Sequence, residues 1–343
     1  MRFLCFGTGA IGTYIGGSLA LAGHDVVFIE RPDVVETVRQ YGLHLQLADG
    51  LQSLSQPKVV SSTAEALSTG RFDAGILAVK SFDTAGAIES LRPFLVDAPP
   101  VVSFQNGVEN EPRIAALLGE DKVIAGTVTT AVGRKGAGSI VVERLRGIGI
   151  AMTHPLSQAL LEAANRAGLK ARGYANPAAM KWSKLLTNLI ANASSAILDM
   201  PPGQIFADPA LYCIEARQLR EALAVMRAMR IPVVDLPSTP VRALAWIVSR
   251  LPYAVSRPLL VRAVGAGRGA KMPSFHIDLY AGRTKSEVEY LNGAVARYGK
   301  KYNVAAPVNK TLTQILMGMT SGEIAKEEYA HQPAKLLAQI PGA

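Results

Sequence analysis

Three glycines near the start of the chain have the spacing that a dinucleotide pyrophosphate requires. They follow a short apolar run, Arg2 to Phe6, and precede a second one from Tyr14 to Leu21. In a strand–turn–helix unit the first glycine allows the tight turn, the second lets the backbone approach the pyrophosphate, and the third lets helix and strand pack closely. The start of the helix adds unpaired N–H groups. The loop therefore predicts a cofactor site formed by Gly7, Thr8, Gly9, Ala10, Ile11 and Gly12.

The end of the next strand bears on the choice of cofactor. The run Asp25 to Ile29 reads as a strand and ends in Glu30-Arg31. A carboxylate there favours the free 2′-hydroxyl of NAD, whereas an arginine can hold the 2′-phosphate of NADP. Arg31 makes NADPH the expected cofactor, with NADH as the alternative.

The same N-terminal segment could instead be a secretory signal, with a cleavage site at Ala20-Leu21-Ala22. Its charged region is a single arginine, Arg2, and three glycines would interrupt the apolar helix. A second strand also follows at once. The dinucleotide-binding interpretation is therefore favoured.

Two later strand-like runs also end in polar residues. Phe72 to Val79 is followed by Lys80, and the run that starts at Val101 is followed by Gln105 and Asn106. In open α/β sheets ligands bind beyond the carboxyl ends of the strands. We expect Lys80, Gln105 and Asn106 to lie at the same edge as the glycine loop and to bind the cofactor there.

A polar stripe follows the pair Asn176-Pro177, where the sequence becomes strongly helical. Such a pair is typical of a helix N-terminus. In the strongly helical stretch after it, Lys184, Asn188 and Asn192 recur at i, i+4 and i+8 and share one face. One lysine and two amides among apolar residues are unusual for a solvated face. The stripe is either a partly exposed edge or a row that faces a substrate, and the latter is favoured.

Bulk composition narrows the class of protein. With 343 residues, 49% hydrophobic and 18% charged, the chain can form two globular domains. Its two cysteines and five scattered histidines give no disulfide framework and no metal-ligand spacing, so we expect a cytoplasmic protein without a metal. The net charge of +9 includes no run of five like charges, which favours small anionic ligands over nucleic acid.

The order of elements predicts an α/β domain followed by an all-helical one. Residues 1–175 form a Rossmann domain whose sheet is extended by antiparallel hairpins between Lys122 and Met152, and residues 176–335 form the helical domain. We expect the tail after Gln332 to be loosely held. The apolar segment 241–270 is interrupted by prolines and arginines and does not span a membrane. An apolar cap, an oligomer contact and a peripheral membrane contact remain open for it.

Taken together, these motifs resemble the ketopantoate reductase (2-dehydropantoate 2-reductase) family over nearly the whole chain. The most specific parts are the glycine loop, Asn106-Gly107, Trp182-x-Lys184-x-x-x-Asn188-x-x-x-Asn192, and the block Ser274 to Gly293. The family has a Rossmann domain, a helical domain and an active site in the cleft between them. It reduces ketopantoate to pantoate with NADPH on the pathway to pantothenate and coenzyme A.

The resemblance implies roles for individual residues. Lys184 would be the general acid that protonates the substrate carbonyl oxygen, and Glu287 would bind the substrate hydroxyl and orient the lysine. A developing alkoxide needs such a positive donor. The expected substrate-binding residues are Asn106, Asn188, Asn192, Ser274 and Lys271, and Lys80 would lie near the cofactor phosphates and ribose.

Departures from the family pattern leave the substrate open. One extra residue separates Ser274 from Glu287, and Lys271 stands where some members have an amide. The alternatives are a related D-2-hydroxyacid dehydrogenase that reduces another 2-ketoacid, or a dinucleotide-binding regulator without turnover. A homodimer is possible.

Overall fold

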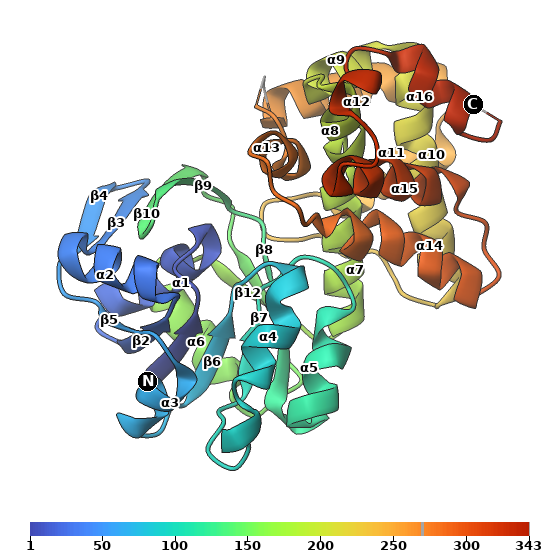
Figure 1. Ribbon diagram of the computed structural model, residues 1–343. Coiled ribbons are helices and arrows are strands. Elements are labelled where there is room, and N and C mark those ends of the chain that lie inside the picture. Colours follow the sequence, from blue (N-terminus) through green and yellow to red (C-terminus); the bar gives the residue numbers. More distant parts are fainter. Residues whose placement is uncertain (269–270, 343) are drawn as a thin grey trace. The chain divides into compact units, whose positions relative to one another are not determined.

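The computed structural model describes residues 1–268 and 271–342, and the chain divides into two compact units. The first contains Met1–Lys181 and Asp235–Thr239, and the second contains Trp182–Val234 and Pro240–Ala343. The first is an α/β unit and the second is helical, so the predicted fold class is confirmed (Figure 1). Helix α7 (Pro177–Leu189) contributes residues to both units.

The first unit is built on an eight-stranded sheet in the order β12-β11-β8-β7-β6-β1-β2-β5. Strands β8, β7, β6, β1, β2 and β5 run parallel, whereas β11 is antiparallel to β8. Because β2 and β6 lie on opposite sides of β1, the strand order reverses next to β1. Ligands of doubly wound sheets bind at such a switch point.

Alternating residues of the first strand enter two hydrophobic cores, one on each face of this sheet. Phe3 and Cys5 pack with residues of α1 and α6, whereas Leu4 and Phe6 pack with residues of α3, α4 and α5. The strands are β1 (Arg2–Phe6), β2 (Asp25–Ile29), β5 (Lys58–Val60), β6 (Ala74–Leu77), β7 (Val101–Ser103), β8 (Val123–Val128), β11 (Ile148–Ala151) and β12 (Ala171–Tyr174). The helices are α1 (Ala10–Leu21), α2 (Pro32–Tyr41), α3 (Thr63–Ser68), α4 (Thr84–Glu89), α5 (Asn110–Leu118) and α6 (Ser157–Arg166).

The hairpin that was expected to extend this large sheet belongs mostly to a second, four-stranded sheet. Strands β9 (Ala131–Gly136) and β10 (Ser139–Arg144) pair with each other and join β3 (Leu43–Leu47) and β4 (Gly50–Leu54) in the order β4-β3-β10-β9. From the predicted hairpin region, β11 adds an antiparallel strand to the large sheet, and β12 runs parallel to β11 at its edge. The cause is the pairing of β10 with β3, because residues 139–141 run parallel to residues 44–46. The prediction of hairpins is correct, but their place in one extended sheet is wrong.

The second unit is helical, and the 20-residue α10 (Pro209–Ala228) contacts helices α9, α11, α12, α14, α15 and α16. Its other elements are α8 (Asn192–Leu198), α9 (Pro202–Ala207), α11 (Val241–Arg250), α12 (Tyr253–Arg268), α13 (Ser274–Tyr280), η4 (Glu287–Tyr290), α14 (Asn292–Lys301), α15 (Pro307–Ser321), η5 (Lys326–Glu328) and α16 (Pro333–Gln339). Residues 269–270 of the apolar segment 241–270 lie outside the described part. Within that part, none of the helices combines the length and the apolar character needed to cross a membrane.

The tail after Gln332 is ordered, contrary to the prediction. Residues Pro333–Gln339 form α16, and Leu336 is fully buried. Arg217 of α10 donates to the carbonyl oxygens of Pro341 and Gly342 at 2.6 and 2.7 Å. The tail is anchored by two buried apolar side chains, Leu336 and Ile340, and by an arginine distant in the sequence, which the short tail sequence by itself did not reveal.

Candidate active site

The carboxyl ends of the central parallel strands lie level with one another. Phe6 of β1 is paired with Leu77 of β6 and with Ile29 of β2, and Leu77 is paired with Ser103 of β7. The residues that follow these strands therefore meet at one edge of the sheet. The edge carries the glycine loop, Glu30, Lys80, Gln105 and Asn106. The predicted convergence of these strand ends is confirmed.

Each glycine of the loop has the environment that the pyrophosphate interpretation requires. Gly7 has φ +94°, which favours glycine. A Cβ on Gly12 would lie only 2.0 Å from the carbonyl oxygen of Gly7. Helix α1 can therefore pack this closely against the turn only because residue 12 has no side chain. A Cβ on Gly9, at the N-cap of α1, would meet nothing within 4 Å. The open space beside the start of α1 fits a pyrophosphate.

Glu30 turns toward the glycine loop. Its Oε1 accepts a hydrogen bond from the backbone N–H of Thr8, and its Oε2 accepts one from the N–H of Arg31, each at 2.9 Å. Burial, with a further contribution from this carboxylate, raises the pKa of the Cys5 thiol far above its usual range, so the thiol stays protonated. The Arg31 side chain is 74% exposed and its guanidinium lies 3.7 Å from Asp33. Such an exposed pair is weak, and the guanidinium can exchange Asp33 for a phosphate.

Gln105 is used inside the protein rather than at its surface. Its buried side chain donates to the carbonyl oxygen of Val79 at 2.9 Å and to the hydroxyl of Thr84 at 2.7 Å. These bonds join the end of β7 to the end of β6 and to α4. Its expected side-chain contact with the cofactor remains a prediction, whereas its bonds here support the neighbouring Lys80 and Asn106.

The backbone at Asn106 is fixed by two side chains. Its carbonyl oxygen accepts hydrogen bonds from the Ser81 hydroxyl at 2.8 Å and from the Asn110 amide at 2.6 Å. Asn110 is buried at the start of α5. Asn106 and Lys80 are both half-buried, so each can present polar atoms at the strand edge.

A second lysine, which sequence reasoning missed, also supports this edge. Lys181 of α7 is 5% exposed, and its ammonium donates to the carbonyl oxygens of Gln105 at 2.6 Å and Gly126 at 3.3 Å. It also lies 2.8 Å from Oε1 of Glu111. Two of the three donors of the ammonium are used in these hydrogen bonds, and its charge is paired with Glu111. Lys181 and Glu111 thus connect α7, α5 and the ends of β7 and β8.

In the second unit, Lys184 and Asn188 lie one turn apart on α7 and are half-buried. The helix around them is almost completely buried, and Leu185, Leu186 and Leu189 are each at most 1% exposed. Lys184 and Asn188 therefore form the expected polar stripe.

Asn192 does not continue that stripe, because the helix breaks before it. Ala191 adopts a left-handed conformation with φ 49°, and Asn192 begins α8. Its side-chain oxygen accepts from the N–H of Phe275 at 3.1 Å, and its nitrogen lies 3.4 Å from the Ser274 hydroxyl. The structure brings Asn192 and Ser274 together, and Asn192 positions the start of α13. The single continuous stripe predicted from the i, i+4, i+8 spacing is wrong in this respect.

The break is stabilised by Glu215 of α10, a second residue that sequence reasoning missed. Its fully buried carboxylate accepts from the N–H of Ala191 at 2.7 Å and from the Ser194 hydroxyl at 2.6 Å. The amide of Gln218 donates to the same carboxylate at 2.7 Å. The sequence does contain a signal for the burial of Glu215. It follows the core residue Leu211 by four positions on α10, so the two residues share one face of that helix.

The remaining predicted residues also lie in the second unit. Glu287 is 3% exposed and begins the 3-10 turn η4, where the hydroxyl of Ser286 accepts from the N–H of Val288 at 3.2 Å. Lys271 and Ser274 are exposed. A buried carboxylate has to be paired or hydrogen-bonded, so the surroundings of Glu287 are polar, as expected for a residue of the site.

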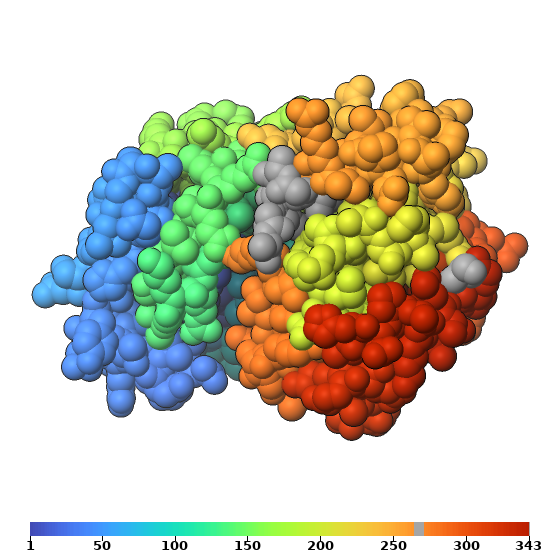
Figure 2. Space-filling model, turned by 90° about the horizontal axis from the view of Figure 1, so that it is seen from above, coloured from blue at the N-terminus to red at the C-terminus, as the bar shows by residue number. Residues whose placement is uncertain are grey.

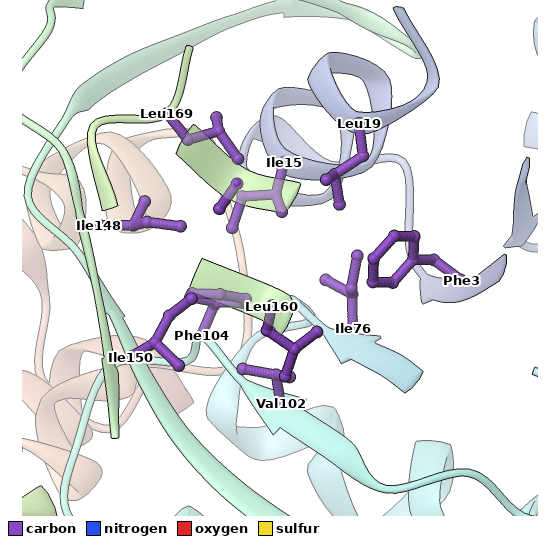
Figure 3. A pocket seen from close by; sticks show the side chains of 11 residues that line it. Phe3, Ile15, Leu19, Ile76, Val102, Phe104, Ile148, Ile150, Leu160 and Leu169 are labelled. Carbon is purple, nitrogen blue, oxygen red and sulfur yellow. The ribbon is translucent and has the colours of Figure 1, made fainter. Parts of the chain in front are cut away.

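The cavity inside the first unit is not part of this site. It has a volume of about 20 Å³ and is lined only by apolar side chains, among them Phe3, Ile15, Leu160 and Leu169 (Figure 3). A space of this size holds one water molecule at most and offers it no hydrogen-bond partner. It is a packing gap between α1, α6 and the sheet.

The glycine loop gives a first testable contrast. Gly12→Ala is expected to destabilise the protein by about 1–3 kcal/mol, because its methyl group would collide with the Gly7 carbonyl oxygen. Gly9→Ala meets no neighbour and should melt like the wild type, yet it should bind a nicotinamide dinucleotide at least tenfold more weakly, because its methyl group occupies the space expected for the pyrophosphate. Thermal melting and fluorescence titration with NADPH measure the two effects. Wild-type NADPH affinity in Gly9→Ala would refute the assignment of this loop to the pyrophosphate.

Comparison with known proteins agrees with this arrangement. Residues 3–153 match the family model described as "Ketopantoate reductase PanE/ApbA", and residues 176–320 match the model of its C-terminal domain. Together these matches cover most of the chain. The chain belongs to the ketopantoate reductase family. It is therefore an NAD(P)-dependent oxidoreductase of the class that acts on CH–OH groups.

Relatives within the ketopantoate reductase family extend over nearly the whole chain. The 2-dehydropantoate 2-reductase of Pyrococcus horikoshii is 28% identical over 328 residues, which cover 94% of this chain and 98% of the relative. The 2-dehydropantoate 2-reductase of Halobacterium salinarum is 27% identical over 331 residues, covering 92% and 98%.

Solved structures give the same fold. A PanE/ApbA family ketopantoate reductase from Ralstonia eutropha is 27% identical with a TM-score of 0.80, and the match covers 94% of this chain and 99% of that one. D-Mandelate dehydrogenase, solved with NADH and anilino(oxo)acetate, has a TM-score of 0.77 over the same shares. At 20% identity, that second likeness concerns the fold alone.

Proposed function

We propose that the protein reduces 2-dehydropantoate (ketopantoate) to pantoate with NADPH, in the cytoplasm and on the route to pantothenate and coenzyme A. The observation that carries the proposal is the half-buried pair Lys184 and Asn188 on the otherwise buried α7. The pair lies at the family's motif positions, in a chain related end to end to 2-dehydropantoate 2-reductases. The ammonium of Lys184 is a cationic hydrogen-bond donor, and the carbonyl oxygen of a 2-ketoacid is an acceptor that fits it.

The cofactor would be held by the first unit. The N–H groups at the start of α1 bind the pyrophosphate, Gly9 leaves room for it, and Arg31 pairs with the 2′-phosphate. Lys80 and Asn106 at the neighbouring strand ends complete the site. The bound cofactor supplies the hydride.

The second unit would supply the proton and hold the substrate. Lys184 donates a hydrogen bond to the keto oxygen and protonates it as negative charge develops there, which is the step where a positioned cation contributes most. Glu287 accepts from the substrate hydroxyl, and Asn188 orients the substrate. Ser274, placed by Asn192, donates to the substrate carboxylate, with the exposed ammonium of Lys271 as a second cationic partner.

A substrate panel tests this function. Oxidation of NADPH and of NADH is followed with ketopantoate, pyruvate, 2-ketoisovalerate and phenylglyoxylate. We expect ketopantoate with NADPH to give the highest kcat/KM. Preference for phenylglyoxylate would instead make the protein a D-2-hydroxyacid dehydrogenase on the same fold. Binding of NADPH without turnover of any ketoacid would make it a regulator.

Arg31→Ala is expected to weaken NADPH binding by about 10- to 100-fold and to change NADH binding little. The reason is that a charge-assisted hydrogen bond contributes about 1.5–3 kcal/mol, and only NADPH has the 2′-phosphate that receives it. Fluorescence titration with both cofactors measures the difference. Arg71→Ala is the control, because Arg71 is exposed just before the amino end of β6, away from the carboxyl edge. Equal losses for NADPH and NADH would show that Arg31 does not bind the phosphate.

A further inference from the structure

Helices α11 and α12 expose large apolar side chains. Trp246 is 59% exposed, Val255 49% and Leu259 48%. Trp246 lies between the exposed Arg242 and Arg250 at intervals of four residues, so the three share one face of α11. Val255 and Leu259, four residues apart, likewise share one face of α12. Arg262 follows Leu259 by three residues and lies on the same face. We call these two stripes together the α11–α12 face.

Both helices pack on α10 through other residues. Val241 and Val248 of α11 are buried, and Arg220 of α10 donates to the carbonyl oxygen of Val248 at 2.7 Å. On α12, the buried Ser256 is hydrogen-bonded to the Tyr212 hydroxyl of α10 at 2.6 Å. Tyr212 and Arg220 are eight positions apart on α10, which places them about two turns apart on the same side of that helix. The contacts with α10 are therefore made by residues that lie outside the two exposed stripes.

The charge of this segment has one sign. Between residues 241 and 263 the chain carries four arginines, Arg242, Arg250, Arg257 and Arg262, and no aspartate or glutamate. The space-filling view shows residues near 250–262, in orange, at the molecular surface (Figure 2). An exposed tryptophan and exposed aliphatic side chains, with the exposed Arg250 and Arg262 beside them, form a surface that is complementary to a partner both apolar and anionic.

We propose that the α11–α12 face binds the surface of an anionic lipid bilayer. Trp246 would lie at the level of the headgroups, Val255 and Leu259 would enter the acyl boundary, and the arginines would reach the lipid phosphates. Nucleic acid would satisfy the arginines but leave the aliphatic side chains without an apolar partner. A second copy docked by a two-fold axis would bring the two arginine stripes together, which repels.

The test measures partition of the full chain onto vesicles. Phosphatidylglycerol–phosphatidylcholine vesicles and pure phosphatidylcholine vesicles are compared at low and high salt, by co-sedimentation and by tryptophan emission. The chain has two tryptophans, and Trp182 is 3% exposed, so a blue shift would report on Trp246. We expect binding to the anionic vesicles only, with a blue shift, and loss of that binding at high salt.

Two triple variants make the test specific. Replacing Arg242, Arg250 and Arg262 by glutamine should weaken binding to the anionic vesicles by about a hundredfold, since each cation near the membrane surface contributes about 1 kcal/mol. The control replaces Lys300, Lys301 and Lys310, which are exposed on α14 and α15, by glutamine and removes the same charge.

Three results would overturn the proposal. The first is no partition at low salt, and the second is an equal loss in the lysine control. The third is a dimer in light scattering that Trp246→Ser dissociates, with no vesicle binding by either form, which would make the face a contact between copies.

Discussion

Lys184→Ala is expected to lower kcat for ketopantoate reduction by a factor of about 10²–10⁴, with NADPH affinity within twofold of the wild type. The factor is that of a positioned general acid, whose proton neutralises the developing alkoxide. The NADPH contacts proposed above are all in the first unit, whereas Lys184 is in the second, so cofactor binding should persist. Steady-state NADPH oxidation and fluorescence titration measure the two quantities on the same sample.

The control is Lys300→Ala, which removes an equally charged but exposed side chain from α14. It should leave kcat unchanged. Turnover of Lys184→Ala at the wild-type rate would exclude it as the acid. A loss of NADPH affinity as large as the loss of kcat would mean that Lys184 supports the fold of the cofactor site instead.

The sequence predicted the first unit better than the second, for a physical reason. Parallel strands buried on both faces give continuous apolar runs bounded by glycine and polar residues, so β1, β2, β6 and β7 could be located from short stretches. Sheet membership depends on pairing between distant segments. The parallel pairing of β10 with β3 joins residues about 95 positions apart, and no local pattern reports it.

The same distinction applies to the site. Gly9, Gly12 and Arg31 could be identified because their roles follow from local backbone geometry and charge. The break at Ala191 could not, because alanine has no preference for a left-handed conformation and Glu215, 24 residues later, stabilises it. Long-range hydrogen bonds of this kind alter the direction of a helix without altering its sequence pattern.

Lys181 is the clearest case of a role hidden from sequence, and it carries the second large prediction. Residues 179–186 of α7 are all buried except Lys184, so the hydrophobic period does not distinguish the two lysines. Lys181→Met is expected to cost about 3–5 kcal/mol of the free energy of unfolding, because it leaves the Glu111 carboxylate, 16% exposed, without its cation. It also removes the donor to the carbonyl oxygens of Gln105 and Gly126. Urea unfolding followed by circular dichroism measures the cost.

A double-mutant cycle separates the ion pair from simple loss of packing. Adding Glu111→Gln to Lys181→Met removes the stranded charge, so the double variant should be more stable than Lys181→Met alone. Arg92→Met is the control, since Arg92 and Glu89 form a pair whose side chains are 61% and 57% exposed, and such solvent-screened pairs contribute little to stability. If Lys181→Met cost no more than this control, the ammonium would not hold the ends of β7 and β8. The position of Asn106 would then depend on bonds such as those from Ser81 and Asn110 and not on Lys181.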